Sequence, residues 1–119
     1  MPIDLSIQLD EDRVWDLLVL AFEGGSNYWI RRVEIATRPT ERVSDRARVP
    51  LMGGALRIHA ADADVTPLRL LDRAAIVHGF GLMAQHHRDH FGDVIRETDD
   101  ATTGDVFLQL CLFDTIVFG

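Results

Sequence analysis

The sequence has one cysteine, no lysine and no apolar run long enough to cross a membrane. Because Cys111 is the single thiol, the chain can form no internal disulfide, which favours a reducing compartment. A membrane-spanning helix needs about 20 apolar residues in a row. The N-terminus has neither the basic start nor the apolar run of a signal peptide. These absences predict a soluble cytoplasmic protein with no membrane contact.

Since lysine is absent, arginine supplies all 12 basic residues, against 19 acidic ones. The two signs are separated along the chain. The net charge is −5 over residues 1–30, +4 over 31–60 and −6 over 61–119. An acidic chain therefore carries one basic segment in its middle third.

Length and composition predict a single domain over residues 1–119, large enough for a core without disulfides. Period-two alternation predicts β-strands. Strands are expected at residues 2–9, 30–37, 54–60 and 67–71, with 115–119 as a further edge strand. Residues 38–50 contain two prolines and follow neither period, so we expect a long, mobile, arginine-rich loop there.

Helical spacing of apolar residues predicts four helices, at residues 10–24, 73–87, 88–97 and 102–113. Asp10 and Asp72 are the expected N-caps of the first two, and a capping box beginning at Thr102 is expected before the last. Gly24 is expected to end the first helix in the left-handed region. The predicted fold is α+β, with a small antiparallel sheet of three to four strands packed against about four helices.

The run from Glu23 to Trp29, Glu-Gly-Gly-Ser-Asn-Tyr-Trp, is the most informative stretch of the chain. Paired glycines allow close backbone approach, and the four residues after them all carry hydrogen-bonding side chains. This mixture is typical of a recognition surface. We expect Asn27 and Tyr28 on the surface and Trp29 half-buried.

Together with the ending from Asp105 to Gly119, which contains Phe-Leu-Gln-Leu-Cys-Leu-Phe, this run resembles a family of small phage and prophage proteins. Those proteins have an EGGSNYW-like motif after their first helix and finish with an FLQLxLF-like segment, so the resemblance spans nearly the whole chain. It departs from the family at Asp114, where glycine is expected. The resemblance implies a mobile-element context, in which small accessory proteins often inhibit host machinery, as anti-CRISPR proteins do. It supplies no catalytic residues.

Acidic residues crowd the segment 89–105, at spacings that could mimic nucleic-acid phosphates. Such a surface would occupy a basic channel of a host protein and gain association rate by steering. A solvated helix face is the alternative explanation. The candidate partner-binding residues are Asn27, Tyr28, Asp89, Asp93, Glu97, Asp99 and Asp100.

Two other functions use different residues. The basic segment between Arg31 and Arg57 could bind DNA or RNA, although the net charge of −7 opposes this at long range. The candidate nucleic-acid contacts are Arg38, Arg42, Arg46 and Arg48. A metal-dependent enzyme would rely on His86 and His90, which share a face if the helix is unbroken, but a third ligand at firm spacing is lacking.

No nucleophile or phosphate loop matches a known pattern, and Cys111 lies among apolar residues where a thiol is unreactive. The sequence therefore predicts a non-enzymatic interaction protein without metal or cofactor, acting on a host protein in the host cytoplasm. Nucleic-acid binding is the alternative function and metal-dependent catalysis the third. Homodimer formation is left open.

Overall fold

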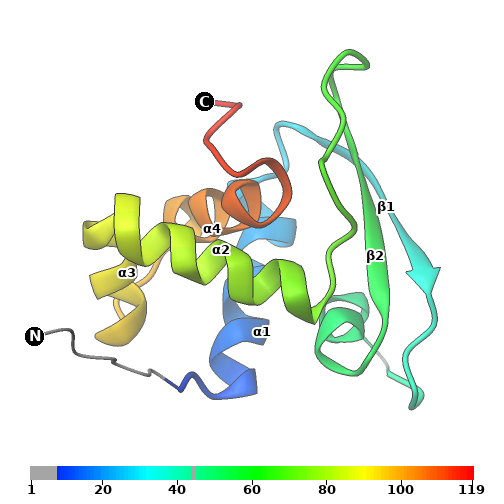
Figure 1. Ribbon diagram of the computed structural model, residues 1–119, viewed down its shortest axis with the longest axis horizontal. Helices are drawn as coiled ribbons and strands as arrows, with labels where there is room; N and C mark the ends of the chain where they lie inside the picture. Colours follow the sequence, from blue (N-terminus) through cyan, green and yellow to red (C-terminus); the bar gives the residue numbers. More distant parts are fainter. Residues whose placement is uncertain (1–7, 44) are drawn as a thin grey trace, which may run out of the picture.

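The computed structural model describes residues 8–43 and 45–119. Figure 1 shows the helices gathered on one side and a two-stranded sheet along the other. The predicted α+β class is confirmed, but the described residues form two strands instead of three or four. The strand predicted at 2–9 lies mostly outside the described residues, and Gln8 and Leu9 are not in a strand.

The first helix, α1 (Glu11–Leu20), begins where predicted, because the Asp10 side chain accepts a hydrogen bond from the amide of Asp12 at 2.9 Å. It continues directly into a π-helical turn, η1 (Ala21–Gly25). The prediction that Gly24 has a positive φ is wrong: among the described glycines only Gly53 and Gly119 do. The wide turn is closed by a hydrogen bond from the amide of Ser26 to the carbonyl of Ala21, 2.8 Å, so no left-handed residue is needed.

The sheet consists of β1 (Ile30–Thr37) and β2 (Ala55–Ala60), paired antiparallel. Val33 lies opposite Ile58, and the register is interrupted by a bulge near each end of β1. On β2, Leu56 and Ile58 are buried against the helices. The intervening odd-numbered positions of β2 face the other side, so the sheet presents a polar outer face.

Neither of the two additional predicted strands forms. Residues 67–71 contribute a single antiparallel bridge, in which Leu71 and Leu56 exchange two hydrogen bonds of 2.9 Å. Pro67 has no amide hydrogen, and the amide of Leu68 donates instead to the carbonyl of Leu112 at 2.8 Å. At the C-terminus the tail is held by a side chain: Gln109 Oε1 accepts hydrogen bonds from two tail amides, at 2.8 and 2.9 Å.

The predicted loop 38–50 is partly regular, because its end forms a 3₁₀ helix, η2 (Arg46–Leu51). Asp45 caps it by accepting a hydrogen bond from the amide of Ala47 at 2.9 Å. Val49 and Leu51 are buried in the main core, although two isolated apolar residues show no period in the sequence. The prediction of one long unstructured loop over residues 38–50 is therefore wrong for residues 46–50.

Three further helices complete the fold: α2 (Arg73–His86), α3 (Arg88–Ile95) and α4 (Ala101–Phe113). Helix α4 is the centre of the core, and ten of its 13 residues are buried. It approaches α2 so closely that a Cβ at Gly79 would lie 2.3 Å from the Sγ of Cys111. Burial raises the pKa of the Cys111 thiol, which agrees with the predicted structural role. None of the described helices is both long and apolar enough to cross a membrane.

Helix α4 begins two residues earlier than the predicted capping box. Asp100 is the N-cap, and its carboxylate accepts a hydrogen bond from the amide of Thr103 at 2.9 Å. The Thr103 hydroxyl in turn lies 3.3 Å from the amide of Asp100, which completes the box. Thr102 is thus inside the helix, and Asp105 is free for another role.

Helix α4 ends at Asp114, whose φ of 66° is left-handed. Glycine is the residue favoured in this conformation, so an aspartate here needs stabilising contacts. Two side chains stabilise the aspartate at this position: Arg69 Nη1 and His78 Nε2 each lie 2.6 Å from Asp114 Oδ1. The hydrogen bond from Arg69, followed by that from His78, lowers the pKa of Asp114.

We expect Asp114→Gly to leave the free energy of unfolding within about 1 kcal/mol of wild type, because relief of the left-handed backbone offsets the lost ion pairs. Asp114→Ala loses the ion pairs without that relief and should cost about 1 to 2 kcal/mol. Since the pKa of Asp114 is lowered by folding, its contribution is present at neutral pH and is lost as the pH falls through the folded pKa. Urea unfolding at pH 7 and pH 3 measures both effects. Equal costs for glycine and alanine would contradict the argument.

Candidate interaction surface

The Glu23–Trp29 run proves to be mainly structural, because three of its side chains bind one buried carboxylate. Ser26 Oγ and Trp29 Nε1 donate to Asp105 Oδ1, and Tyr28 OH donates to Oδ2, each at 2.7 Å. Gln109 adds a fourth donor to Oδ1 at 3.1 Å. Four hydrogen bonds compensate the burial of a charged group that is only 9% exposed.

Trp29 is fully buried, not half-buried as predicted. Its indole N–H meets the carboxylate of Asp105, and its ring stacks on Phe118 at 5.2 Å between centroids. Tyr28 is 56% exposed, as predicted, yet its hydroxyl turns inward. Desolvation, followed by the hydrogen bond to Asp105, raises the pKa of Tyr28 to about 12. Within the motif, the side chain of Asn27 is exposed and forms no hydrogen bond with the described residues.

Most of the acidic candidates have structural partners. Asp99 is almost buried, with 4% of its side chain exposed, and is paired with Arg13. Asp100 caps α4, and hydrogen bonds from Thr103 lower its pKa. Asp93 accepts from Thr98 Oγ1 at 3.1 Å. Of the five acidic candidates, only Asp89 and the weakly paired Glu97 remain exposed without such a role in the described part of the chain.

Asp93 and Glu97 also do not share a helix face, as the prediction of a helix over 88–97 required. Helix α3 ends at Ile95, and Glu97 has a φ of 59°, so the chain has already turned. The hydrogen bond from the amide of Thr98 to the carbonyl of Asp93, 2.8 Å, closes this turn. The acidic segment is therefore a helix end and a cap rather than a regular row of charges.

The histidine pair is divided between two helices. His86 is in the last turn of α2 and His90 is in α3, because the chain leaves helical geometry at His87. His90 Nδ1 lies 3.2 Å from Thr103 Oγ1. The described residues contain no group of three or more side chains placed to hold a metal ion.

The arginines divide into paired ones, spread along the chain, and unpaired ones that fall mostly in one segment. Seven of the 12 form an ion pair with a described carboxylate. Within the described residues, the arginines without such a partner are Arg31, Arg38, Arg42, Arg46 and Arg88. Four of these five belong to the basic segment predicted from the sequence, although Arg48, a fourth predicted contact, is paired with Asp12 at 3.0 Å.

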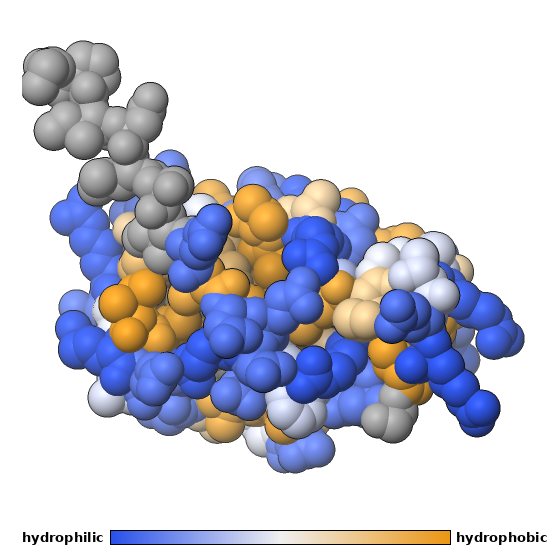
Figure 2. All heavy atoms as spheres, turned by 90° about the horizontal axis from the view of Figure 1, so that it is seen from below, coloured by the Kyte–Doolittle hydropathy of each residue, from blue (hydrophilic) through white to orange (hydrophobic). Residues whose placement is uncertain are grey.

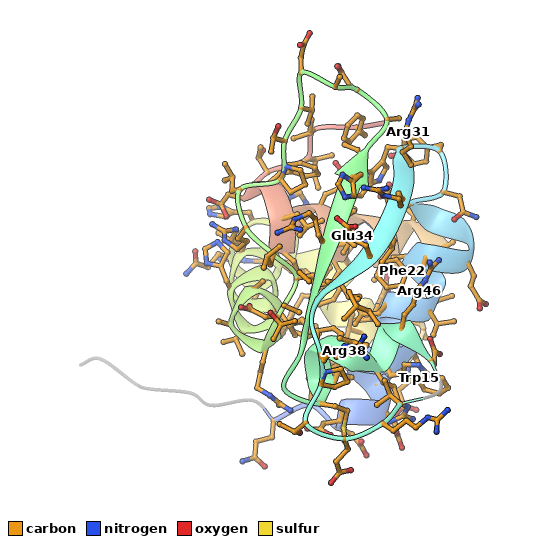
Figure 3. The ribbon with its side chains drawn as sticks, turned by 90° about the vertical axis from the view of Figure 1, so that its right-hand side faces the viewer. Trp15, Phe22, Arg31, Glu34, Arg38 and Arg46 are labelled. Atoms are coloured by element: carbon orange, nitrogen blue, oxygen red, sulfur yellow. The ribbon has the colours of Figure 1, made fainter. Side chains whose placement is uncertain are left out.

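Figure 3 shows how these arginines lie beside aromatic side chains. Along the side of β1 that faces away from β2, Arg31, Phe22, Arg46 and Trp15 follow one another, with Arg38 at the far end of the strand. We call these five residues the arginine–aromatic face. These five residues come from five different segments, namely α1, η1, β1, η2 and the loop after β1. They are separated in the sequence and come together only in the folded chain.

The upper part of this face is hollowed. A cavity of about 290 Å³ is lined by Phe22, Asn27, Ile30, Arg31, Arg32, Val33 and Arg46. Its lining is more polar than apolar, and two of its guanidinium groups, those of Arg31 and Arg46, have no carboxylate partner among the described residues, so it suits a ligand that carries negative charge. Arg31 belongs to the basic segment predicted from the sequence, although it was not among the four named contacts. Phe22 was absent from the predicted contacts, and its only sequence signal was its position just before the Gly-Gly run.

The lower part of the face is held in place by Trp15. Its indole N–H donates to Asp45 Oδ2 at 2.9 Å, and the guanidinium of Arg48 lies over its ring, 4.3 Å from the centroid. These contacts attach the start of η2 to α1. Arg46 is therefore carried on an ordered 3₁₀ helix and not on a free loop.

The outer face of the sheet carries a second polar group. Glu34 lies 2.8 Å from His59 Nε2 and 3.5 Å from Arg57 Nη1, across the two strands. The hydrogen bond from His59 contributes most to lowering the pKa of Glu34. Arg32 also lies 3.6 Å from Glu34, so this one carboxylate pairs with two guanidinium groups. The arginines of the arginine–aromatic face have no such carboxylate among the described residues.

A larger hollow of about 490 Å³ lies between the start of α1 and helices α2 and α3, with Val14, Ile76, Phe80 and Phe91 in its lining. Figure 2 shows apolar side chains on the lower side of the molecule, interrupted by polar ones.

No protein-family model, curated protein or solved structure matches this chain.

Proposed function

We propose that this chain is a non-enzymatic interaction protein of a phage or related mobile element that binds a host protein through its arginine–aromatic face. Its role would be to inhibit or modulate a host defence or nucleic-acid-handling protein in the host cytoplasm. The observation that supports this surface is the distribution of unpaired arginines, four of five of which lie on or next to β1 and η2.

This proposal places the contact on a different surface from the acidic one expected from the sequence. The acidic residues at 93, 99 and 100 have partners within the fold, so their charges are already balanced or directed at backbone amides. The guanidinium groups of Arg31, Arg38 and Arg46 have no carboxylate partner among the described residues and are exposed. Unbalanced exposed charge is available for complementarity with a partner, whereas paired charge is not.

Nucleic acid is the second candidate ligand. Phe22 lines the same cavity as Arg31, and an aromatic ring beside an arginine can stack on an unpaired base. The net charge of −7 opposes a polyanion at long range, which is why we place this candidate second. Steep loss of affinity with rising salt would identify it.

The test is charge reversal with a matched control. We expect Arg31→Glu with Arg46→Glu to reduce capture of the host partner from lysate by about 100-fold, since two favourable contacts become repulsive. Arg88→Glu introduces the same type of reversal at an exposed, unpaired arginine on α3 and should change capture by less than about twofold. All variants should retain the wild-type melting temperature within a few degrees.

The opposite result would assign partner binding to the acidic surface expected from the sequence. If Asp89→Arg with Glu97→Arg abolishes capture and the arginine reversals leave it intact, the arginine–aromatic face is not the contact. Affinity for a poly-dT or poly-U oligonucleotide that the arginine reversals remove would instead assign the face to nucleic acid.

A further inference from the structure

One edge of β1 is free. Among the described residues the sheet has two strands, so no strand pairs with β1 on the side away from β2. Leu56 of β2 uses both its N–H and its C=O to bond Leu71, on the far side from β1. In an antiparallel pair these groups alternate in direction, so the opposite residue, Ile35, is not hydrogen-bonded to β2.

The same alternation fixes the direction of the neighbouring groups. Val33 is opposite Ile58 and has the same parity as Ile35, so both residues direct their N–H and C=O outward from the sheet. Arg32 and Glu34, which are opposite His59 and Arg57, direct theirs toward β2. The free edge thus offers two donors and two acceptors, and the bulges near its ends confine it to the stretch between Arg32 and Ile35.

This edge borders the arginine–aromatic face. Val33 lines the 290 Å³ cavity together with Phe22, Arg31 and Arg46. In an added strand, a residue opposite Val33 would project its side chain to the same side as Val33, that is, toward this cavity. If this residue is acidic, its carboxylate would lie near the unpaired guanidinium groups of the cavity. Its backbone would form hydrogen bonds with the unpaired backbone groups of β1.

We infer that the free edge of β1 accepts an extended, acidic peptide segment of the partner, which adds to the sheet as a third strand. The inference rests on the proposed function, because it specifies what part of a partner the arginine–aromatic face contacts. Backbone hydrogen bonds to Val33 and Ile35 provide affinity, and Arg31 and Arg46 select acidic side chains at alternate positions.

A second copy of this chain fits the edge less well. Antiparallel pairing of two β1 strands centred on Val33 would place Arg32 opposite Glu34, which is favourable. It would also bring Arg31 and Arg46 of both copies to one place with no described carboxylate to balance them. Like charges so placed repel one another and are destabilising. An acidic partner would balance the charge of these arginines, whereas a second copy would not.

The probe for the experiment is a blocked peptide of about seven residues that alternates threonine and glutamate, long enough to cover the edge. We expect wild-type protein to bind it in low salt by fluorescence anisotropy. A second peptide carries N-methyl groups on its glutamate amides, which removes the strand-forming donors and keeps the charge. It should bind at least about tenfold more weakly.

The matching change in the protein is Ile35→Pro, which removes an outward N–H without removing a bond to β2. Its dissociation constant for the peptide should be about tenfold higher than that of Ile35→Ala, a variant that loses the same side chain and keeps the amide. Circular dichroism and thermal melting establish that both variants fold.

Three outcomes would overturn the inference and separate it from the proposed function. Equal binding of the two peptides, abolished by Arg46→Glu, would mean that the face binds acids without strand addition. Binding of an oligonucleotide but of neither peptide would assign the edge to nucleic acid. A dimer in sedimentation that Ile35→Pro dissociates would show that a second copy occupies it.

Discussion

Asp105→Ala should destabilise the protein by about 3 to 5 kcal/mol, because four donors, three of them on buried residues, lose their common acceptor. Ser26 and Trp29 have no route to water, since both are buried. Asp105→Asn keeps one acceptor and the volume, and should cost about 1 to 3 kcal/mol. Chemical denaturation at neutral pH measures all variants.

The control is Asp64→Ala, an exposed carboxylate in the turn after β2, which should change stability by less than about 0.5 kcal/mol. If Asp105→Ala is no more destabilised than this control, the buried carboxylate does not organise the junction. Where Asp105→Ala fails to fold, the asparagine variant still decides the question.

Tyr28 gives an independent measurement of the same network, because it is the only tyrosine in the chain. Its pKa is raised to about 12 in the folded protein. The raised pKa means that the contribution of Tyr28 to stability is complete below its unfolded pKa of about 10 and is lost as the pH rises toward 12. In Asp105→Asn the ultraviolet titration of the phenol should move back toward 10.

The elements that the sequence predicted best are those with a strong period or a single cap. Helix α2 begins behind Asp72 as expected, and β1 spans the predicted residues 30–37. The burial of Cys111 followed from its apolar neighbours. Each of these inferences uses residues within one or two turns of each other, which is the range over which periodicity carries information.

Two predicted elements, the start of the last helix and the strand at 67–71, were wrong because single contacts decide them. Asp100 and Thr102 are both acceptable N-caps by residue type. Asp100 is the N-cap in the structure because its side chain and that of Thr103 bond each other's backbone amides. Residues 67–71 alternate like a strand, but one proline and one hydrogen bond to α4 limit them to a bridge. Alternation alone does not determine whether a segment finds a partner strand.

The site could not be predicted because its residues meet only in the folded chain. Asp105 lies 79 residues after Ser26, and nothing in either segment marks them as partners. The high density of hydrogen-bonding side chains in the Glu23–Trp29 run marks a buried junction at Ser26 and Trp29, while Asn27 stays exposed and lines the 290 Å³ cavity. The basic segment was recognised, whereas its aromatic neighbours on α1 and η1 were not.

Gly25→Ala should be among the most destabilising single substitutions in the chain. A Cβ at Gly25 would lie 1.9 Å from the carbonyl oxygen of Ala101 and 2.8 Å from its carbonyl carbon. These are backbone atoms in the first turn of α4, so they cannot move aside as a flexible side chain would. Separating η1 from α4 would also lengthen the hydrogen bonds from Ser26 and Trp29 to Asp105. We expect a loss of about 3 kcal/mol or more.

Gly24→Ala is the matched control, because the two glycines are adjacent and belong to the same π-helical turn. A Cβ at Gly24 would lie 3.8 Å from the Cβ of Ala101, an ordinary contact, and the φ of Gly24 is not positive. Alanine there reduces the freedom of the unfolded chain and should raise stability by about 0.4 to 1 kcal/mol. Thermal and urea unfolding of the two variants measure the difference. A destabilised Gly24→Ala beside a tolerated Gly25→Ala would mean that the helix ends in a left-handed glycine, as the sequence alone had suggested, and that η1 and α4 do not meet at Gly25.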